Sequence, residues 1–514
     1  MMEVAAMRYS RRELIANGLG LAGLGLLPAR VLRAQELRFS SDPFTLGVAS
    51  GYPEPGAVVL WTRLAPEPLA PGGGMPRGAD AVPVDWEVAE DDGFRRIRRS
   101  GVTYATPDWA HSVHVEVAGL EPGRDYWYRF TSGGARSPVG HTRTAPVDPR
   151  SLKLAVASCQ QYEGGHYAAY AAMARDDLDL VLHVGDYIYE MRGRTDRVRS
   201  HDTAECYTLD DYRGRYAIYK SDPLLQAAHA NAPWMVTWDD HEVDNDYADR
   251  RSLEGDPEEL FLARRAAAYQ AYYEHMPLPR RLVPFGPHQR LHARRGFGEL
   301  AEIWTLDGRQ FRSAHACGTG LVSPCSALYA EERTMLGAQQ EQWLGAGLER
   351  SGARWKLLAQ QTVFAHMDQA PGPDIGYWSD GWSGYPAGRQ RLLDFIAERN
   401  IANPLILSGD IHAFLANAVH ARPGDPDTPV VATEFVTTSI SSPGPRQAVL
   451  DAWVPENPNV RFARGEVRGY VRLSLDAESV HAEFVGVDDV SQADSGTHVV
   501  ASFDVAAGEP GLQG

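Results

Sequence analysis

The spacing of apolar residues changes near residue 150. Between about residues 40 and 148, short runs such as 60–64 and 111–117 alternate apolar and polar positions with a period of two, separated by turns rich in Gly and Pro. Beyond residue 152, continuous apolar runs end in polar loops and alternate with helical stretches. We therefore expect an all-β sandwich domain at 40–148 and an α/β domain at 152–506.

Individual elements follow from the same pattern. The aromatic alternation of Tyr126–Phe130, after a turn at 121–123, resembles the end of a fibronectin-type sandwich. Helices are expected at 256–275, with Pro257 in the first turn, and at 389–399. The tail at 469–505 returns to alternating strands. Buried strands are predicted at 154–157, 180–184, 234–237, 300–305, 355–359 and 404–407.

The first 34 residues have the character of an export signal. Arg11 and Arg12 form a twin-arginine signature, and a Gly-rich apolar stretch at 14–27 follows it. That stretch is too short to span a bilayer, so we expect a signal peptide cleaved near Ala34 and no transmembrane anchor. The alternative is a buried N-terminal helix. The signal predicts passage through the twin-arginine export machinery to the periplasm or the exterior.

The net charge argues against one class of function, and the cysteine spacing suggests a disulfide. The 514 residues carry a formal net charge of −17, which argues against nucleic acid binding, because phosphate backbones attract basic surfaces. A small phosphorylated substrate stays open, since bound metal ions reverse the local field. Cys317 and Cys325 lie close enough in sequence to close a short disulfide loop, and Cys206 is an alternative partner for either. Cys159 is then left unpaired.

Polar residues cluster just after four of the predicted strands. In sheet-based α/β proteins, ligands bind beyond the carboxyl ends of strands, so these residues are expected to meet. Taken singly, each has an ordinary structural interpretation, such as a buried thiol or a core aromatic. The residues are Cys159 after 154–157, Asp186 and Tyr189 after 180–184, Asp240, His241 and Asn245 after 234–237, and Asp410 and His412 after 404–407.

This donor set suits metal ions. Carboxylate and phenolate oxygens bind hard cations, and a thiolate binds iron or zinc. We expect Asp186 to bridge two ions, and Asp410 and His412, two apart on a strand, to face the same way. Two adjacent ions suit phosphoester hydrolysis because they clamp the phosphate and lower the pKa of a bound water. His241, beside Asp240, would bind the phosphate or protonate the leaving group.

The chain resembles the PhoD-type alkaline phosphatase family of metallophosphoesterases. Five segments carry the resemblance: 158–160, 185–190, 238–243, 380–386 and 408–412. It implies a four-layer αββα sandwich preceded by the small β-sandwich, and a ferric ion, Fe(3+), held by Cys159, Asp186 and Tyr189, with calcium, Ca(2+), nearby. Further ligands implied by the resemblance are Asp240, Asn245, Asp410 and His412. One departure is Asp246, where the family often has a second asparagine, so either Asn245 or Asp246 is the ligand.

The expected function is hydrolysis of phosphomonoesters and phosphodiesters by a metal-activated water, with Asp186 and His241 as the catalytic residues. A phospholipase-D-like diesterase acting on lipid headgroups is the nearest alternative. An iron–tyrosinate oxidoreductase and a cell-surface binding protein are alternatives of other classes.

Overall fold

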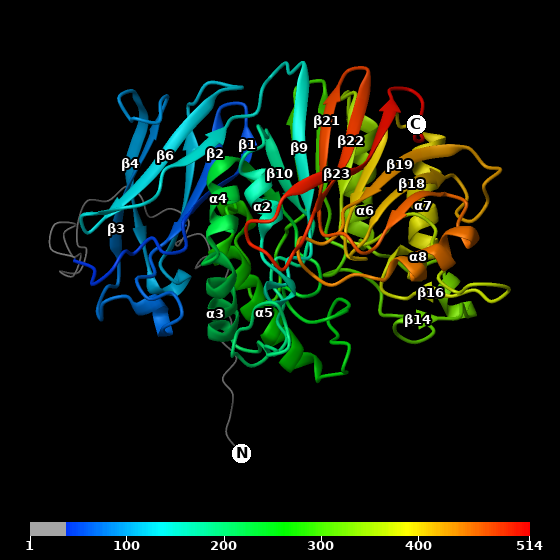
Figure 1. Ribbon diagram of the computed structural model, residues 1–514, viewed down its shortest axis with the longest axis horizontal. Helices are drawn as coiled ribbons and strands as arrows, with labels where there is room; N and C mark the ends of the chain where they lie inside the picture. The colour runs from blue at the N-terminus through cyan, green and yellow to red at the C-terminus, as the bar shows by residue number, and fades with distance from the viewer. Residues whose placement is uncertain (1–37, 514) are drawn as a thin grey trace, which may run out of the picture.

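The computed structural model describes residues 38–513, so the expected export signal lies outside the described residues. Two large mixed sheets pack against each other through a shared apolar core (Figure 1). The first has nine strands in the order β23-β22-β21-β9-β10-β11-β1-β2-β5. These are β1 Val48–Glu54, β2 Ala57–Arg63, β5 Ser112–Ala118, β9 Ser151–Ala157, β10 Leu180–His183, β11 Pro233–Val236, β21 Gly469–Asp476, β22 Ser479–Val487 and β23 Thr497–Ala506.

The second large sheet has seven strands in the order β12-β13-β15-β17-β19-β18-β20. They are β12 Ala293–Phe297, β13 Ala301–Thr305, β15 Trp355–Ala359, β17 Pro404–Ser408, β18 Phe414–His420, β19 Val430–Val436 and β20 Val460–Arg464. The helices are α2 Ala168–Met173, α3 Leu209–Lys220, α4 Pro223–Asn231, α5 Glu258–His275, α6 Ala338–Arg350, α7 Pro386–Glu398 and α8 Gln447–Trp453. All six predicted buried strands and both predicted helices are present, with ends shifted by a few residues.

Alternate side chains of the seven-stranded sheet pack into different cores. Leu357 and Leu405 join the large cluster that also contains Leu154 and Leu182 from the nine-stranded sheet, so this cluster fills the space between the sheets. Their neighbours Leu358 and Ile406 join a second cluster with residues of α6 and α7. This alternation follows from the period of two in a strand. It places one apolar layer between the sheets and another beneath α6 and α7.

The N-terminal strands are divided between two sheets. The apolar runs at 60–64 and 111–117 form β2 and β5, but these strands extend the nine-stranded sheet, because β1 pairs in parallel with β11. At that junction a Cβ on Gly51 would lie 2.6 Å from the carbonyl oxygen of Trp234, so the close approach requires glycine. A five-stranded sheet packs on β2 and β5 through a shared apolar core. Its strands are β3 Val82–Ala89, β4 Ile97–Ala105, β6 Asp125–Ser132, β7 Ala135–Arg136 and β8 Gly140–Arg143.

Two smaller features complete the fold. β14 Leu321–Val322 pairs with β16 Tyr377–Trp378, and the disulfide between Cys317 and Cys325 closes the loop that contains β14. The predicted disulfide is therefore confirmed over its Cys206 alternatives, and Cys159 and Cys206 are free and buried. Pro257 lies one position before the first turn of α5, as its N-cap, because its ψ of 130° is extended.

Candidate metal centre

The loops that carry the predicted ligands meet where strands of both large sheets end. β9, β10 and β11 are adjacent and parallel, so the loops after them leave the same edge. The backbone amide of Cys159 donates to the carbonyl of Gly185 over 3.1 Å, which ties the loop after β9 to the loop after β10. The loop after β17 comes from the other sheet and packs closely on them, because a Cβ on Gly409 would lie 2.4 Å from the Ser158 hydroxyl. The predicted convergence of strand ends is present.

Four of the predicted ligands have a left-handed backbone. Their φ angles are 57° for Cys159, 56° for Asp186, 67° for Asp410 and 58° for His412. Residues other than glycine rarely adopt this region, and such strain concentrates at functional sites. The expectation that Asp410 and His412 lie on a strand is wrong, because β17 ends at Ser408. Their side chains reach the site from a strained loop instead.

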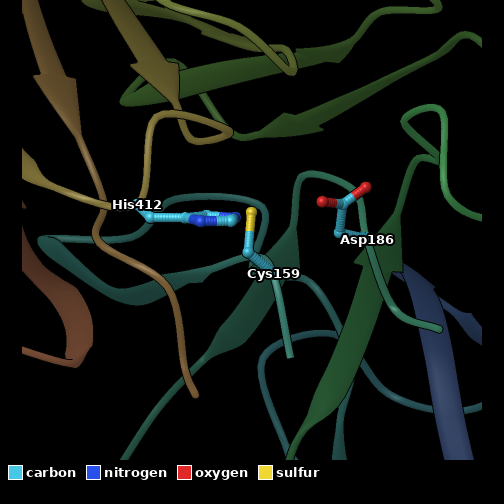
Figure 2. Close-up of side chains that lie close together, drawn as sticks. All are labelled: Cys159, Asp186 and His412. Carbon is cyan, nitrogen blue, oxygen red and sulfur yellow. The ribbon is translucent and has the colours of Figure 1, made fainter. Parts of the chain in front are cut away.

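Two groups of potential metal ligands share Asp186. Ligand atoms of Cys159, Asp186 and His412 lie within 4.8 Å of one another, and so do those of Asp186, Asp240 and His241. In Figure 2 the imidazole of His412 lies beside the Cys159 sulfur, and a carboxylate oxygen of Asp186 points toward them. Within residues 38–513, the buried Oδ1 atoms of Asp186 and Asp240 have no hydrogen-bond partner. Unpartnered buried carboxylate oxygens require a compensating group.

Tyr189 belongs to the same cluster. Its hydroxyl donates to Oδ2 of Asp186 over 2.8 Å and lies 3.3 Å from Nε2 of His412. Ser442 donates to the Tyr189 oxygen over 2.7 Å, which orients the phenol. A tyrosine three residues after an aspartate therefore does reach the same point in space.

The remaining predicted ligands line one cavity of about 400 Å³ beside these groups. Asn245, Asp246 and Asp410 all contribute to its wall. The backbone amide of Asn245 donates to Glu190 over 3.0 Å, and the backbone amide of Asp246 donates to Asp240 over 2.7 Å, so both residues are tied to the site. Both residues line the cavity, and both side chains contain an oxygen of the kind that binds metals.

The electrostatics of the cluster favour a cation. Burial, together with the neighbouring charge of Asp186, raises the pKa of both the Cys159 thiol and the Tyr189 phenol well above their ordinary values. Burial and neighbouring aspartates likewise raise the pKa values of Asp186 and Asp410. Burial lowers the pKa of His412 to about 4, so its ring is neutral and keeps a lone pair for a metal. A thiol, a phenol and carboxyls gathered in one buried place match the donor set of a metal centre.

His241 lines the same cavity and is held by a neighbouring carboxylate. Its Nδ1 lies 2.7 Å from a carboxylate oxygen of Glu190, and the ring lines the cavity. Burial lowers the pKa of His241, but Glu190, Asp240 and Asp186 together raise it well above the ordinary value. The surrounding carboxylates therefore favour the protonated imidazole, and the contact with Glu190 fixes the orientation of the ring.

Two supporting features were missing from the sequence prediction. Glu242 accepts hydrogen bonds from the backbone amides of Tyr187 (2.6 Å) and Asp239 (2.8 Å). It therefore ties the loop after β10 to the loop after β11. It is the residue directly after His241, so it lay inside a segment already singled out.

The second feature is a buried ion network around Arg309. This guanidinium pairs with Asp239, lies 2.8 Å from Asp380 and lies 3.5 Å from Asp240. Arg312 also pairs with Asp380. Arg309 follows β13 as Asp240 follows β11, so the strand-end signal applied to 300–305 would have found it.

Comparison with known proteins identifies the family of this chain. Residues 154–484 match the PhoD-like phosphatase family, and residues 30–146 match the N-terminal domain of PhoD-like phosphatases. Alkaline phosphatase D of Bacillus subtilis (strain 168) is 45% identical over 522 residues, covering 98% of this chain and 89% of that protein. A solved structure of PhoD superposes with a TM-score of 0.90 at 46% identity, covering 93% of each chain. Across residues 38–513, no helix has the length and apolar character needed to cross a membrane. The chain belongs to the PhoD-like phosphatase family and is a phosphoester hydrolase.

Proposed function

We propose that the hydrolase is metal-dependent, with Fe(3+) held by Cys159, Asp186 and Tyr189, Ca(2+) bound nearby, and four further residues as metal ligands. Those four are Asp240, Asn245, Asp410 and His412. The observation that carries the proposal is Asp186, a buried carboxylate shared by both ligand groups and left with an unpartnered oxygen. The bound ions would supply a water of lowered pKa and neutralise charge on the phosphate.

Side chains of the protein position the substrate and transfer the proton. The cluster loops fix Asp186 between the two groups, and Glu190 holds the His241 ring toward the cavity. His241 binds a phosphate oxygen in the ground state and gives its proton to the leaving alcohol oxygen as the ester bond breaks. Preorganisation of charge and position is what phosphoryl transfer mainly needs.

The test is a substrate panel with metal analysis. Purified enzyme is assayed on 4-nitrophenyl phosphate, bis-4-nitrophenyl phosphate and phosphatidylcholine, and its metal content is measured by elemental analysis. We expect cleavage of the first two and stoichiometric iron and calcium. Cleavage of the lipid alone would favour the phospholipase-D-like alternative, which the apolar residues in the cavity wall support. Redox turnover without ester cleavage would favour the iron–tyrosinate oxidoreductase, and metal-free inactive protein would favour the binding protein.

Architecture and export are part of the same proposal. We infer a four-layer αββα catalytic domain at 152–506, supported by the apolar layers on both faces of the seven-stranded sheet. The fibronectin-like domain at 40–148 is supported by its five-stranded sheet, which packs on β2 and β5 around an apolar cluster distinct from the one between the large sheets. Export by the twin-arginine route rests on Arg11 and Arg12. Replacing both by lysine should retain the enzyme inside the cell, and unchanged activity outside would contradict the route.

A further inference from the structure

The catalytic cavity is lined by two chemically distinct groups of residues. One group is the ionisable residues of the metal centre. The other group is apolar and consists of Leu321, Val363, Met367, Trp378, Ile411 and Trp453. We call these six residues the apolar wall. A cavity of about 400 Å³ has room for more than a phosphate group, since small-molecule sites typically span about 300–1,000 Å³.

Paired strands, a disulfide-closed loop and a helix carry three of the residues of the apolar wall. Leu321 of β14 lies directly opposite Trp378 of β16 in an antiparallel pair, so both side chains are on the same face of this ribbon. The disulfide between Cys317 and Cys325 holds the loop that carries Leu321. In Figure 1 the ribbon lies close to α8, the helix that ends at Trp453, and the two line the same cavity.

The wall combines a rigid floor with an exposed rim. Val363 and Met367 are buried in an apolar core cluster, which fixes the floor. At the rim, Leu321 is 51% exposed and Trp378 is 42% exposed. Large apolar side chains exposed beside an active centre mark a binding surface, because exposure there costs free energy that a ligand recovers.

The apolar wall offers no positive charge to a second anionic group of the substrate. Among the described residues that line the cavity there is no lysine or arginine, and four are aspartates. Arg309 lies behind them and is engaged by three carboxylates. A second phosphate or carboxylate on the substrate would therefore meet no cation on the wall.

We propose that the apolar wall selects phosphate esters whose alcohol part is uncharged and apolar, with Trp378 and Trp453 as specificity-determining residues. This inference rests on the proposed phosphoester hydrolysis at the metal centre. The phosphate lies among the ionisable residues, and the alkyl or aryl chain of the alcohol packs on the wall. Longer apolar alcohols gain binding energy, while glycerol or a second phosphate gains none.

The test is a homologous series of soluble substrates. Ethyl, butyl and hexyl phosphate differ in chain length but hardly in leaving-group reactivity, and all are used as monomers in solution. A fully buried methylene is worth about fourfold in affinity. A wall open on one side should give about half that free energy, so kcat/KM should rise about 15-fold from ethyl to hexyl phosphate.

Substitutions test whether the chain-length preference depends on the apolar wall. Trp378→Ala and Trp453→Ala should each reduce the hexyl-to-ethyl ratio of kcat/KM at least threefold. Phe285→Ala is the matched control, since Phe285 is 84% exposed and outside the cavity, and should keep the wild-type ratio. Active wild-type enzyme with a flat chain-length series would overturn the inference, as would an unchanged ratio in both tryptophan variants. Loss of activity on every ester would instead refute the proposed function. The wild-type series decides the matter even if a variant fails to fold.

Discussion

Replacing Arg309 by methionine tests whether the buried ion network stabilises the metal centre. Arg309 is almost completely buried, and its guanidinium contacts Asp239, Asp240 and Asp380. Methionine has a similar shape and leaves little cavity, so the main effect is loss of a positive charge. Asp239 has no other ion-pair partner within the described residues, whereas Asp380 keeps Arg312.

The expected loss of stability is about 3 kcal/mol at pH 8. Breaking a buried ion pair costs roughly 3–5 kcal/mol, and the partner kept by Asp380 puts this case at the lower end. Burial raises the pKa of Asp239 to about 7 although Arg309 lowers it, so removing Arg309 raises this pKa further. Above pH 7 the wild-type carboxylate is ionised and stabilised by Arg309, whereas the variant must either bury an unpaired charge or keep the carboxyl protonated. The loss should therefore grow as the pH rises from 6 to 9.

Urea denaturation of metal-free protein, followed by tryptophan fluorescence, measures this loss. A cycle with Asp239→Asn should give a coupling energy of about 2 kcal/mol, because the double variant no longer buries that unpaired charge. Arg399→Met is the control, since Arg399 forms an exposed 3.3 Å pair with Glu349 and should cost less than about 1 kcal/mol. A loss below about 1 kcal/mol in Arg309→Met, additive effects in the cycle, or a loss independent of pH would refute the reasoning.

Other predictions concern the metal ligands, the proton donor and a buried lysine. Cys159→Ser should lose tightly bound iron and most activity, and elemental analysis showing normal iron with wild-type turnover would contradict the ligation. Tyr189→Phe should abolish a visible charge-transfer band of the purified enzyme, measured by absorption spectroscopy; a band of unchanged intensity would exclude the tyrosinate. His241→Gln should lower kcat by about 10²–10⁴ on alkyl phosphates and by much less on 4-nitrophenyl phosphate, whose leaving group needs no proton; equal losses on both would remove the proton-donor role. Burial lowers the pKa of Lys220 to about 7. Between about pH 7 and 10.5 the unfolded chain therefore binds more protons than the folded chain. The folded state gains stability as the pH rises through that window. Lys220→Met should raise stability at pH 7 by up to about 4 kcal/mol and flatten this slope in thermal denaturation, whereas an unchanged slope would show that the ammonium is not buried in solution.

Much of the site was predictable because residues that directly follow neighbouring parallel strands must lie at the same edge of the sheet. Once buried strands were recognised from apolar runs, parallel neighbours had to deliver Cys159, Asp186 and Asp240 to one edge. The same rule applied to the end of β13 would have added Arg309. It was missed because a positive residue does not resemble a ligand, although it neutralises three carboxylates near the ligands.

Other features could not be read from local patterns. The alternation that identifies β2 and β5 as strands does not say which sheet they join, and the pairing of β1 with β11 spans a long stretch of sequence. The left-handed backbone of Asp410 and His412 also has no local signal, because neither residue is glycine. Such conformations are imposed by the surrounding packing.

The strand order of the nine-stranded sheet has a consequence for how the chain is made. Its middle strands, β9 to β11, are flanked on one side by β1, from the start of the chain, and on the other by β21, from near its end. Until the last strands are synthesised, β9 lacks its outer neighbour, and a chain begun at residue 150 would leave β11 with an open edge. Edges of this kind pair with other chains and aggregate. The enzyme is therefore expected to complete its catalytic sheet only after translation ends, and we expect that removing either β1 or β21 would leave no working phosphatase.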